Sequence, residues 1–237
     1  MIRDKDSNVL KLLNKELKKY KVKLAFRYYD ICPFNNNKME IMEIILKHTE
    51  LLESYHNKIS ILSSLCDETF KNSVPYLMDT YFYFIENVYS VPLDEEYLLN
   101  LCDTIAKINS PCYPDLYKKF LCGSLTQSAE SMIKMLAEYN INEYDDIILG
   151  LVKKENLIPK AWIGVLNEDS KYWCSYIAMK CIVNKKDEKY LSFFNEILGD
   201  EFMCWINFSD SKYKNKLTME WKKKYKLLAE KGIKKIK

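Results

Sequence analysis

Two histidines, eight cysteines and two pairs of adjacent carboxylates are the side chains that could support metal binding or acid–base chemistry. His48 and His56 are eight residues apart, which on one helix separates them by about 12 Å along the axis and about 80° around it. One metal ion cannot bind both side chains in that geometry. The sequence contains neither an HExxH motif nor a Cys/His set with zinc-ligand spacing, so we predict no metal and no cofactor.

The cysteines have the spacing of reduced thiols rather than that of a disulfide framework. No CxxC pair is present, and most cysteines lie inside apolar helical patterns, which predicts buried thiols in a cytosolic protein. Cys174 and Cys181 would share one face of a helix, about 10 Å apart along its axis, and are expected in the core. A Cys–His nucleophile pair could form only in space, and no feature of the sequence favours one.

The adjacent carboxylates are Glu95 with Glu96 and Asp145 with Asp146. Consecutive residues of a helix point about 100° apart, so neither pair converges on one atom as a catalytic pair would. Placement near helix starts, where the helix dipole favours negative charge, explains them better. The five glycines form no phosphate-binding loop and GxSxG is absent, so we predict that the protein is not an enzyme.

The elements that position these residues are predicted to be helices along nearly the whole chain. Gly (5) and Pro (6) are scarce, which disfavours sandwiches and barrels with their many tight turns. TYFYFI (80–85) is predicted as a buried helix, because its neighbours are helical and no second strand is evident. Apolar periodicity predicts helical segments at 8–24 (broken near Tyr20), 39–52, 59–65, 74–85, 98–108, 116–122, 124–139, 142–154, 159–168, 167–182, 187–198 and 212–237.

Several local signals indicate where these helices begin and which segments separate them. Asp94 is expected as the N-cap of one helix and Asn142 as the N-cap of another. Pro75 suits a first helical turn. The segment 28–40, with Pro33 and three consecutive asparagines, and the segment SPCYP (110–114) are predicted as loops.

A short sequence echo suggests a repeated unit. LSSLCD at 62–67 returns as LLNLCD at 98–103, and Met132 and Met135 follow in the same register 34 residues further on. Residues at i and i+3 share one face of a helix. Because a helix pair cannot bury its apolar face alone, such a repeat predicts stacked pairs with one continuous core.

Two stretches repeat the order of an apolar helix, a charged turn and a second apolar helix: KISILSSLCDETFKNSVPYL (58–77) and SKYWCSYIAMKCIVNKKDEKYLSFFNEIL (170–198). On these stretches the chain resembles the α-solenoid class, most nearly HEAT-like repeats, over residues 38–200. The resemblance implies an all-α fold of stacked antiparallel helix pairs. The alternative is an irregular globular helical bundle.

Charge divides the chain, expected to be a single domain (1–237), into a basic N-terminal helix and loop (1–37), an acidic helical-repeat body (38–211) and a basic C-terminal helix (212–237). Residues 1–27 carry a net charge of +6 and residues 212–237 a net charge of +9. Residues 28–211 hold 16 basic and 28 acidic side chains, a net charge of −12. Such a body repels nucleic-acid phosphates and attracts a cationic partner.

The charge pattern predicts a non-catalytic protein-binding helical-repeat protein with an acidic surface for a basic protein partner. An immunity protein that neutralises a cationic toxin fits best. The alternatives are a nucleic-acid-binding HEAT-like protein of the alkylation-repair DNA glycosylase type and a host-interacting factor of an AT-rich virus. Tyr172 and Trp173, beside Asp169, are expected to form an exposed aromatic cluster. The candidate partner-binding residues are Asp67, Glu68, Asp94, Glu95, Glu96, Asp145, Asp146, Asp169, Tyr172 and Trp173.

The C-terminal helix has an apolar stripe formed by Leu217, Trp221, Tyr225 and Leu228, with lysines on its other faces. It is expected to close the stack, to pair with the acidic body so that their charges cancel, or to contact RNA, DNA or an anionic membrane. The lysine-rich termini are thus the route by which nucleic acid could bind. The N-terminus is charged from its start, and no uncharged stretch approaches the roughly 20 residues of a membrane span. We therefore expect a cytoplasmic protein without membrane insertion.

Overall fold

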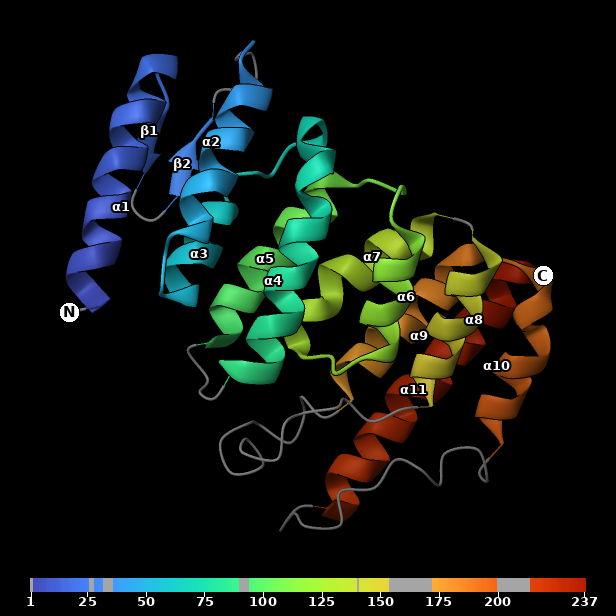
Figure 1. The fold of residues 1–237 in the computed structure, drawn as a ribbon. Helices are drawn as coiled ribbons and strands as arrows, with labels where there is room; N and C mark the ends of the chain where they lie inside the picture. Colours follow the sequence, from blue (N-terminus) through green and yellow to red (C-terminus); the bar gives the residue numbers. More distant parts are fainter. Residues whose placement is uncertain are drawn as a thin grey trace. The chain divides into compact units, whose positions relative to one another are not determined.

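The computed structural model describes residues 2–25, 28–31, 36–89, 94–139, 141–153, 172–199 and 214–237. Apart from one short hairpin, the regular elements in these ranges are helices, which confirms the predicted all-α class (Figure 1). The chain divides into two compact units, Met1–Phe120 (unit 1) and Leu121–Lys237 (unit 2). The boundaries predicted at 37/38 and 211/212 divide the chain by charge and not by compactness, and they stay predictions.

Unit 1 contains α1 (Ile2–Leu17), η1 (Lys18–Tyr20), β1 (Lys23–Ala25), β2 (Tyr28–Asp30), α2 (Lys38–Glu50), α3 (Tyr55–Leu62), η2 (Glu68–Ser73), α4 (Val74–Asn87), α5 (Asp94–Ile108) and most of α6 (Pro114–Cys122). Unit 2 contains η3 (Gln127–Ala129), α7 (Glu130–Glu138), α8 (Asn142–Val152), α9 (Trp173–Lys185), η6 (Glu188–Tyr190), α10 (Leu191–Leu198) and α11 (Lys214–Ile236). The predicted helix at 159–168 lies outside the described residues.

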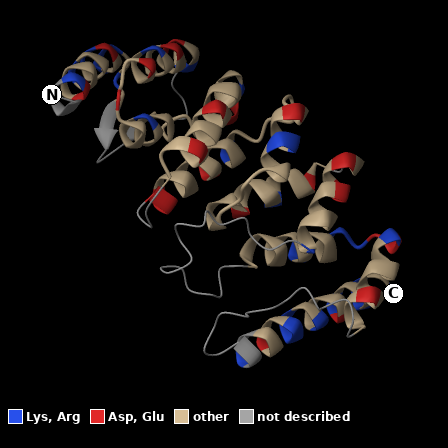
Figure 2. Ribbon diagram, turned by 60° about the horizontal axis from the view of Figure 1, so that its bottom comes forward, with Lys and Arg blue, Asp and Glu red and all other residues tan. Residues whose placement is uncertain are grey.

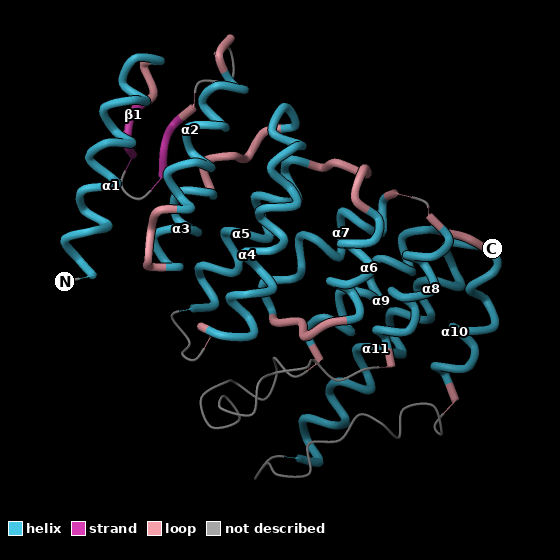
Figure 3. Tube along the Cα trace, viewed as in Figure 1, coloured by secondary structure: helices cyan, strands magenta, loops and turns pink. Residues whose placement is uncertain are grey.

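The hairpin corrects the predicted helix 8–24, whose last residues are not helical (Figure 3). The expected break near Tyr20 is present, because α1 ends at Leu17 and Lys21 adopts a left-handed conformation with φ 59°. Leu24 then pairs with Tyr29 in an antiparallel ladder, within a segment expected to be a loop. Aromatic residues such as Tyr28 and Tyr29 suit strands, and apolar periodicity over so few residues does not separate a strand from a helix.

Most other boundaries follow the local signals. Residues 80–85 are helical within α4, and Pro75 lies in its first turn. The first four residues of SPCYP lie between α5 and α6, and its last, Pro114, begins α6. The caps expected at Asp94 and Asn142 are both wrong, because these are the first residues of α5 and α8. Ile141 is the capping residue of α8 and forms no side-chain bond. Helix ends depend on which backbone groups find tertiary partners, and so they shift by a residue or two.

The core of unit 1 lies where α1, α2, α3, α4 and α5 pack on one another. Leu62 and Leu65 of the first echo and Leu98 and Leu101 of the second are all fully buried. Leu65 lies beyond the end of α3, however, so the first pair does not share a helix face as the second does. Both copies of the repeated stretch therefore supply core positions. Only the second copy places its two leucines on one face of one helix.

The core of unit 2 is organised around α9, which packs on α7, α8 and α11, while α11 also packs on α10. The predicted stripe of α11 is buried at Trp221 and Tyr225, and Gly232 continues it. A Cβ atom at Gly232 would lie 2.6 Å from the Phe194 ring, so α10 and α11 approach too closely there for any other residue without a shift. None of the described helices is long and apolar enough to cross a membrane.

Candidate functional site

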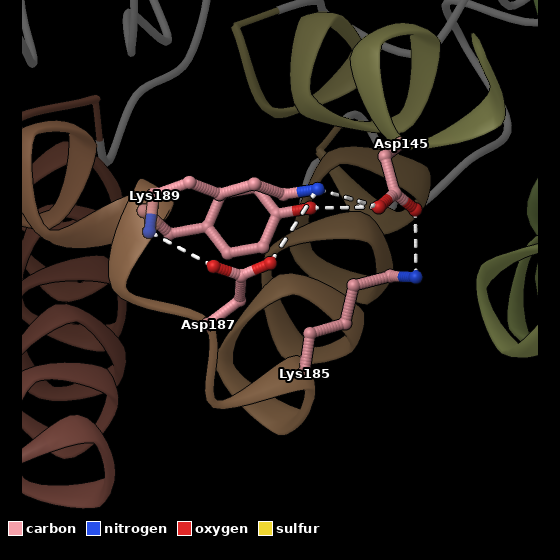
Figure 4. Close-up of polar contacts among 5 residues, drawn as sticks. Asp145, Lys185, Asp187 and Lys189 are labelled. Atoms are coloured by element: carbon pink, nitrogen blue, oxygen red, sulfur yellow. Dashed lines mark hydrogen bonds and ion pairs between the residues drawn. The ribbon is translucent and has the colours of Figure 1, made fainter. Parts of the chain in front are cut away.

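Asp145, a predicted binding residue, is buried inside unit 2, where it pairs with lysine and tyrosine side chains (Figure 4). Its carboxylate lies 2.6 Å from Lys185 Nζ and 3.1 Å from Lys189 Nζ, and it accepts a 3.0 Å hydrogen bond from the Tyr190 hydroxyl. Burial opposes its ionisation, but the bonds from Lys185, Lys189 and Tyr190 outweigh that effect and lower the pKa of Asp145. Asp145 thus holds α8 to α9 and η6 and is not available to a partner, whereas its neighbour Asp146 is exposed.

Asp67, another predicted residue, also has an internal role. It precedes η2, accepts a bond from the Thr69 backbone N–H at 3.0 Å, and forms a 2.8 Å ion pair with Lys38 of α2. The Lys38 ammonium, followed by the Thr69 hydroxyl, lowers the pKa of Asp67 to about 2. The neighbouring Glu68 is exposed.

Lys38→Gln is expected to raise the pKa of Asp67 from about 2 toward its ordinary 3.8, while the Thr69 bonds keep it somewhat lower. Because the folded-state pKa is depressed, the stabilisation is present above the unfolded pKa and is lost as the pH falls through about 2. It is worth at most about 1 kcal/mol, since the carboxylate is partly exposed. An NMR titration of the Asp67 side chain measures the shift. An unchanged Asp67 pKa in Lys38→Gln would show that Lys38 is not its cause.

The start of α5 places Asp94, Glu95 and Glu96 in three different environments. Asp94 is buried and lies 2.7 Å from Nε2 of His56, while Glu95 accepts a 2.6 Å hydrogen bond from the Tyr89 hydroxyl. Of these three predicted residues, Asp94 is buried, Glu95 is half-buried and Glu96 is exposed.

The expected exposed aromatic cluster is wrong at Tyr172, which is fully buried against Trp221 with ring centroids 5.8 Å apart. Trp173 is half-buried and donates its indole N–H to Glu130 at 2.9 Å. Asp169 lies outside the described residues. A large aromatic side chain at a helix start is as useful for packing as for binding, and sequence alone does not separate the two uses.

The histidines and cysteines also differ from expectation. His48 is in α2 and His56 in α3, two separate helices rather than one, because the chain breaks after Glu50. Cys102 and Cys174 are buried as predicted, but Cys66, Cys112 and Cys122 are exposed, since they lie in connections or at the end of a helix. Within the described ranges no group of three His, Cys, Asp or Glu residues is placed to hold a metal ion.

The exposed surface of α3 and α4 carries a stacked tyrosine pair that the sequence analysis did not single out. The rings of Tyr55 and Tyr83 are 4.4 Å apart and nearly parallel, at 11°. Tyr83 is 46% exposed, which is high for an aromatic side chain of this size. Lys58 Nζ lies 4.5 Å from the centroid of the Tyr55 ring, so this stack already accepts a cation on one side.

Three carboxylates of α2 and α4 in this part of unit 1 are exposed: Glu50, Asp79 and Glu86. Asp79 and Glu86 lie on the same stripe of α4 as Tyr83, at spacings of four and three residues. Glu50 is the last residue of α2. Burial raises the pKa of Tyr76, a hydrogen bond with Thr49 lowers it, and the charge of Glu50 raises it further; Tyr76 in turn acts on the pKa of Tyr55. Among the described residues none of these three carboxylates forms an ion pair. We call Tyr55, Tyr83, Glu50, Asp79 and Glu86 the tyrosine–acid face.

This face combines aromatic and acidic side chains on the exposed surface of unit 1. It offers flat aromatic area, with the Lys58 ammonium against one ring, and three carboxylates that form no ion pair among the described residues. The helical spacing of Asp79, Tyr83 and Glu86, by four and three residues, could have indicated this stripe from the sequence. The Tyr55–Tyr83 contact could not be found that way, since it joins two helices.

Comparison of the chain with protein-family models, with curated proteins and with solved structures found no match.

Proposed function

We propose that the chain is a non-catalytic helical protein that binds a cationic protein partner through the tyrosine–acid face. The observation that carries this proposal is a half-exposed tyrosine stack together with exposed carboxylates that pair with no cation in the described part of the chain. Tyrosine is enriched at the centres of protein interfaces, where it buries a large area with little loss of side-chain entropy. Lysine or arginine side chains of a partner would meet carboxylates and aromatic faces together.

The charge of this part of the chain supports the same proposal. Residues 28–120 carry 14 acidic and seven basic side chains, a net charge of −7. Figure 2 shows acidic positions distributed over its helices. A field of this sign speeds association with a basic protein and disfavours the phosphate backbone of nucleic acid.

The proposal extends to the arrangement of the helices and to the class of partner. We infer stacked helix pairs of the HEAT-like α-solenoid kind, supported by the burial of Leu62, Leu98 and Met132 in successive pairs. An immunity protein that masks a cationic toxin is the specific case we favour. The six described cysteines are all free, which supports a cytoplasmic location.

Affinity capture from the native organism tests the binding surface with three versions of the chain. The first is the natural sequence and the second is E50Q/D79N/E86Q, which neutralises the tyrosine–acid face with isosteric side chains. The control is E40Q/E43Q/D115N, which changes the net charge equally at exposed carboxylates elsewhere in unit 1. We expect the natural and control chains to retain the same basic protein at equal stoichiometry, and the face variant to retain about tenfold less.

Two results would contradict the proposal. Equal retention of the basic protein by all three chains would show that it binds elsewhere, and recovery of nucleic acid alone would replace the cationic protein by another class of partner.

A further inference from the structure

The C-terminal helix α11 is held against unit 2 in one defined rotation about its axis. Tyr225 shares a hydrogen bond with the Ser175 hydroxyl of α9, and Gly232 lies against the Phe194 ring of α10. Trp221 is buried among the rings of Tyr172 and Tyr176. These contacts leave the opposite side of α11 directed to solvent.

That outer side combines positive charge with large apolar side chains. Met219 is 72% exposed, the highest value among the large hydrophobic residues that the structure describes. Leu227 and Leu12 follow at 54%. At about 100° per residue, Met219 and Leu227 lie in the same half of the helix as the exposed lysines. Five lysines outnumber Glu220 and Glu230 there: Lys216, Lys223, Lys224, Lys231 and Lys234. We call these lysines with Met219 and Leu227 the basic face.

We propose that the basic face binds the surface of an anionic lipid bilayer, with α11 lying parallel to the plane of the membrane. The 23 residues of α11 span about 34 Å, long enough for several lysines to reach headgroup phosphates at once. Each lysine near an anionic surface strengthens binding by roughly fivefold. Met219 and Leu227 would enter the boundary between headgroups and acyl chains, as the apolar residues of interfacial helices do.

The exposed apolar residues favour lipid over nucleic acid and over a second copy of the chain. Nucleic-acid phosphates would pair with the lysines but would leave Met219 and Leu227 in water. Glu220 and Glu230 would repel the phosphates. A second copy would place lysines against lysines, which repel. A bilayer surface uses both the charge and the apolar side chains of this face.

Vesicle co-sedimentation at about 0.15 M salt tests the proposal on the full chain. The probes are vesicles of phosphatidylglycerol mixed with phosphatidylcholine and vesicles of phosphatidylcholine alone. One variant, M219S/L227S, removes the apolar contacts, and another, K216Q/K223Q/K231Q, removes charge. The matched control is M39S/L99S, since Met39 and Leu99 are exposed by 41% and 42% on helices of unit 1. Circular dichroism checks that each variant is folded.

We expect the natural chain and M39S/L99S to bind the anionic vesicles and not the neutral ones. Both basic-face variants should lose at least about tenfold in vesicle binding. The variant E50Q/D79N/E86Q should bind vesicles normally, because this proposal does not rest on the tyrosine–acid face. Failure of the natural chain to bind anionic vesicles would overturn the proposal. So would binding that M219S/L227S leaves unchanged while single-stranded RNA competes for it.

Discussion

Replacing Asp145 with alanine is expected to lower the free energy of unfolding of unit 2 by about 3 kcal/mol. The substitution removes the shared partner of Lys185, Lys189 and the Tyr190 hydroxyl. Lys185 is only 11% exposed and would keep a desolvated charge without its carboxylate. The value lies at the low end of the range for broken buried ion pairs, because Lys189 is 44% exposed and can return to water.

Asp146 supplies the matched control for this prediction. It is the next residue of α8 and is exposed, so Asp146→Ala should change the free energy of unfolding by no more than about 0.5 kcal/mol. Native-state hydrogen exchange of the amides in α8 and α9 measures both changes within unit 2. Equal effects of the two substitutions would mean that the Asp145 ion pairs contribute nothing beyond a charge near a helix start.

The pH dependence of this difference provides a second check. The pKa of Asp145 is lowered in the folded state, so its contribution is complete above the ordinary carboxylate range and decreases as the pH falls through the folded-state pKa. The gap between Asp145→Ala and the natural chain should therefore narrow in acid. A gap that widens as the pH falls would contradict the assigned direction.

Trp221→Ala is expected to cost about 3–5 kcal/mol in the free energy of unfolding of unit 2. The indole is 2% exposed and contacts the rings of Tyr172, Tyr176 and Tyr225. Its removal leaves a cavity between α9 and α11 that these tyrosines cannot fill without leaving their own positions. Denaturant unfolding followed by circular dichroism, with hydrogen exchange of α11, measures the loss.

Leu227→Ala on the outer side of the same helix is the comparison for Trp221→Ala. Leu227 is 54% exposed, and alanine favours the helix slightly, so a change within about 0.5 kcal/mol is expected. A large loss in Leu227→Ala would show that the outer side of α11 is covered, and it would also remove the basis for the basic face.

Much of the helical structure could be predicted because apolar periodicity is a local property. The helix across TYFYFI, the first-turn position of Pro75 and the break at SPCYP all follow from neighbouring residues. The hairpin at Lys23–Ala25 and Tyr28–Asp30 was missed, since three-residue strands are too short to show an alternating pattern. The sequence analysis placed His48 and His56 on one helix because it missed the short break between α2 and α3.

The candidate site was much less predictable than the helices. Among the predicted acidic residues, Glu68, Glu96 and Asp146 are exposed, whereas Asp94 and Asp145 are buried and paired. All five look alike in the sequence, as carboxylates near helix starts. The tyrosine–acid face was overlooked because its central contact joins Tyr55 to Tyr83 across two helices.

The sequence by itself determined the helical class, the positions of most helices and the concentration of lysine in α11, because each depends on residue types and their spacing. Only the tertiary structure decided which carboxylates form ion pairs or hydrogen bonds inside the protein. Lys189 is 44 residues from Asp145, and His56 is 38 residues from Asp94. A side chain's freedom to bind another molecule depends on such distant neighbours, whose approach is set by the packing of helices and not by any local pattern.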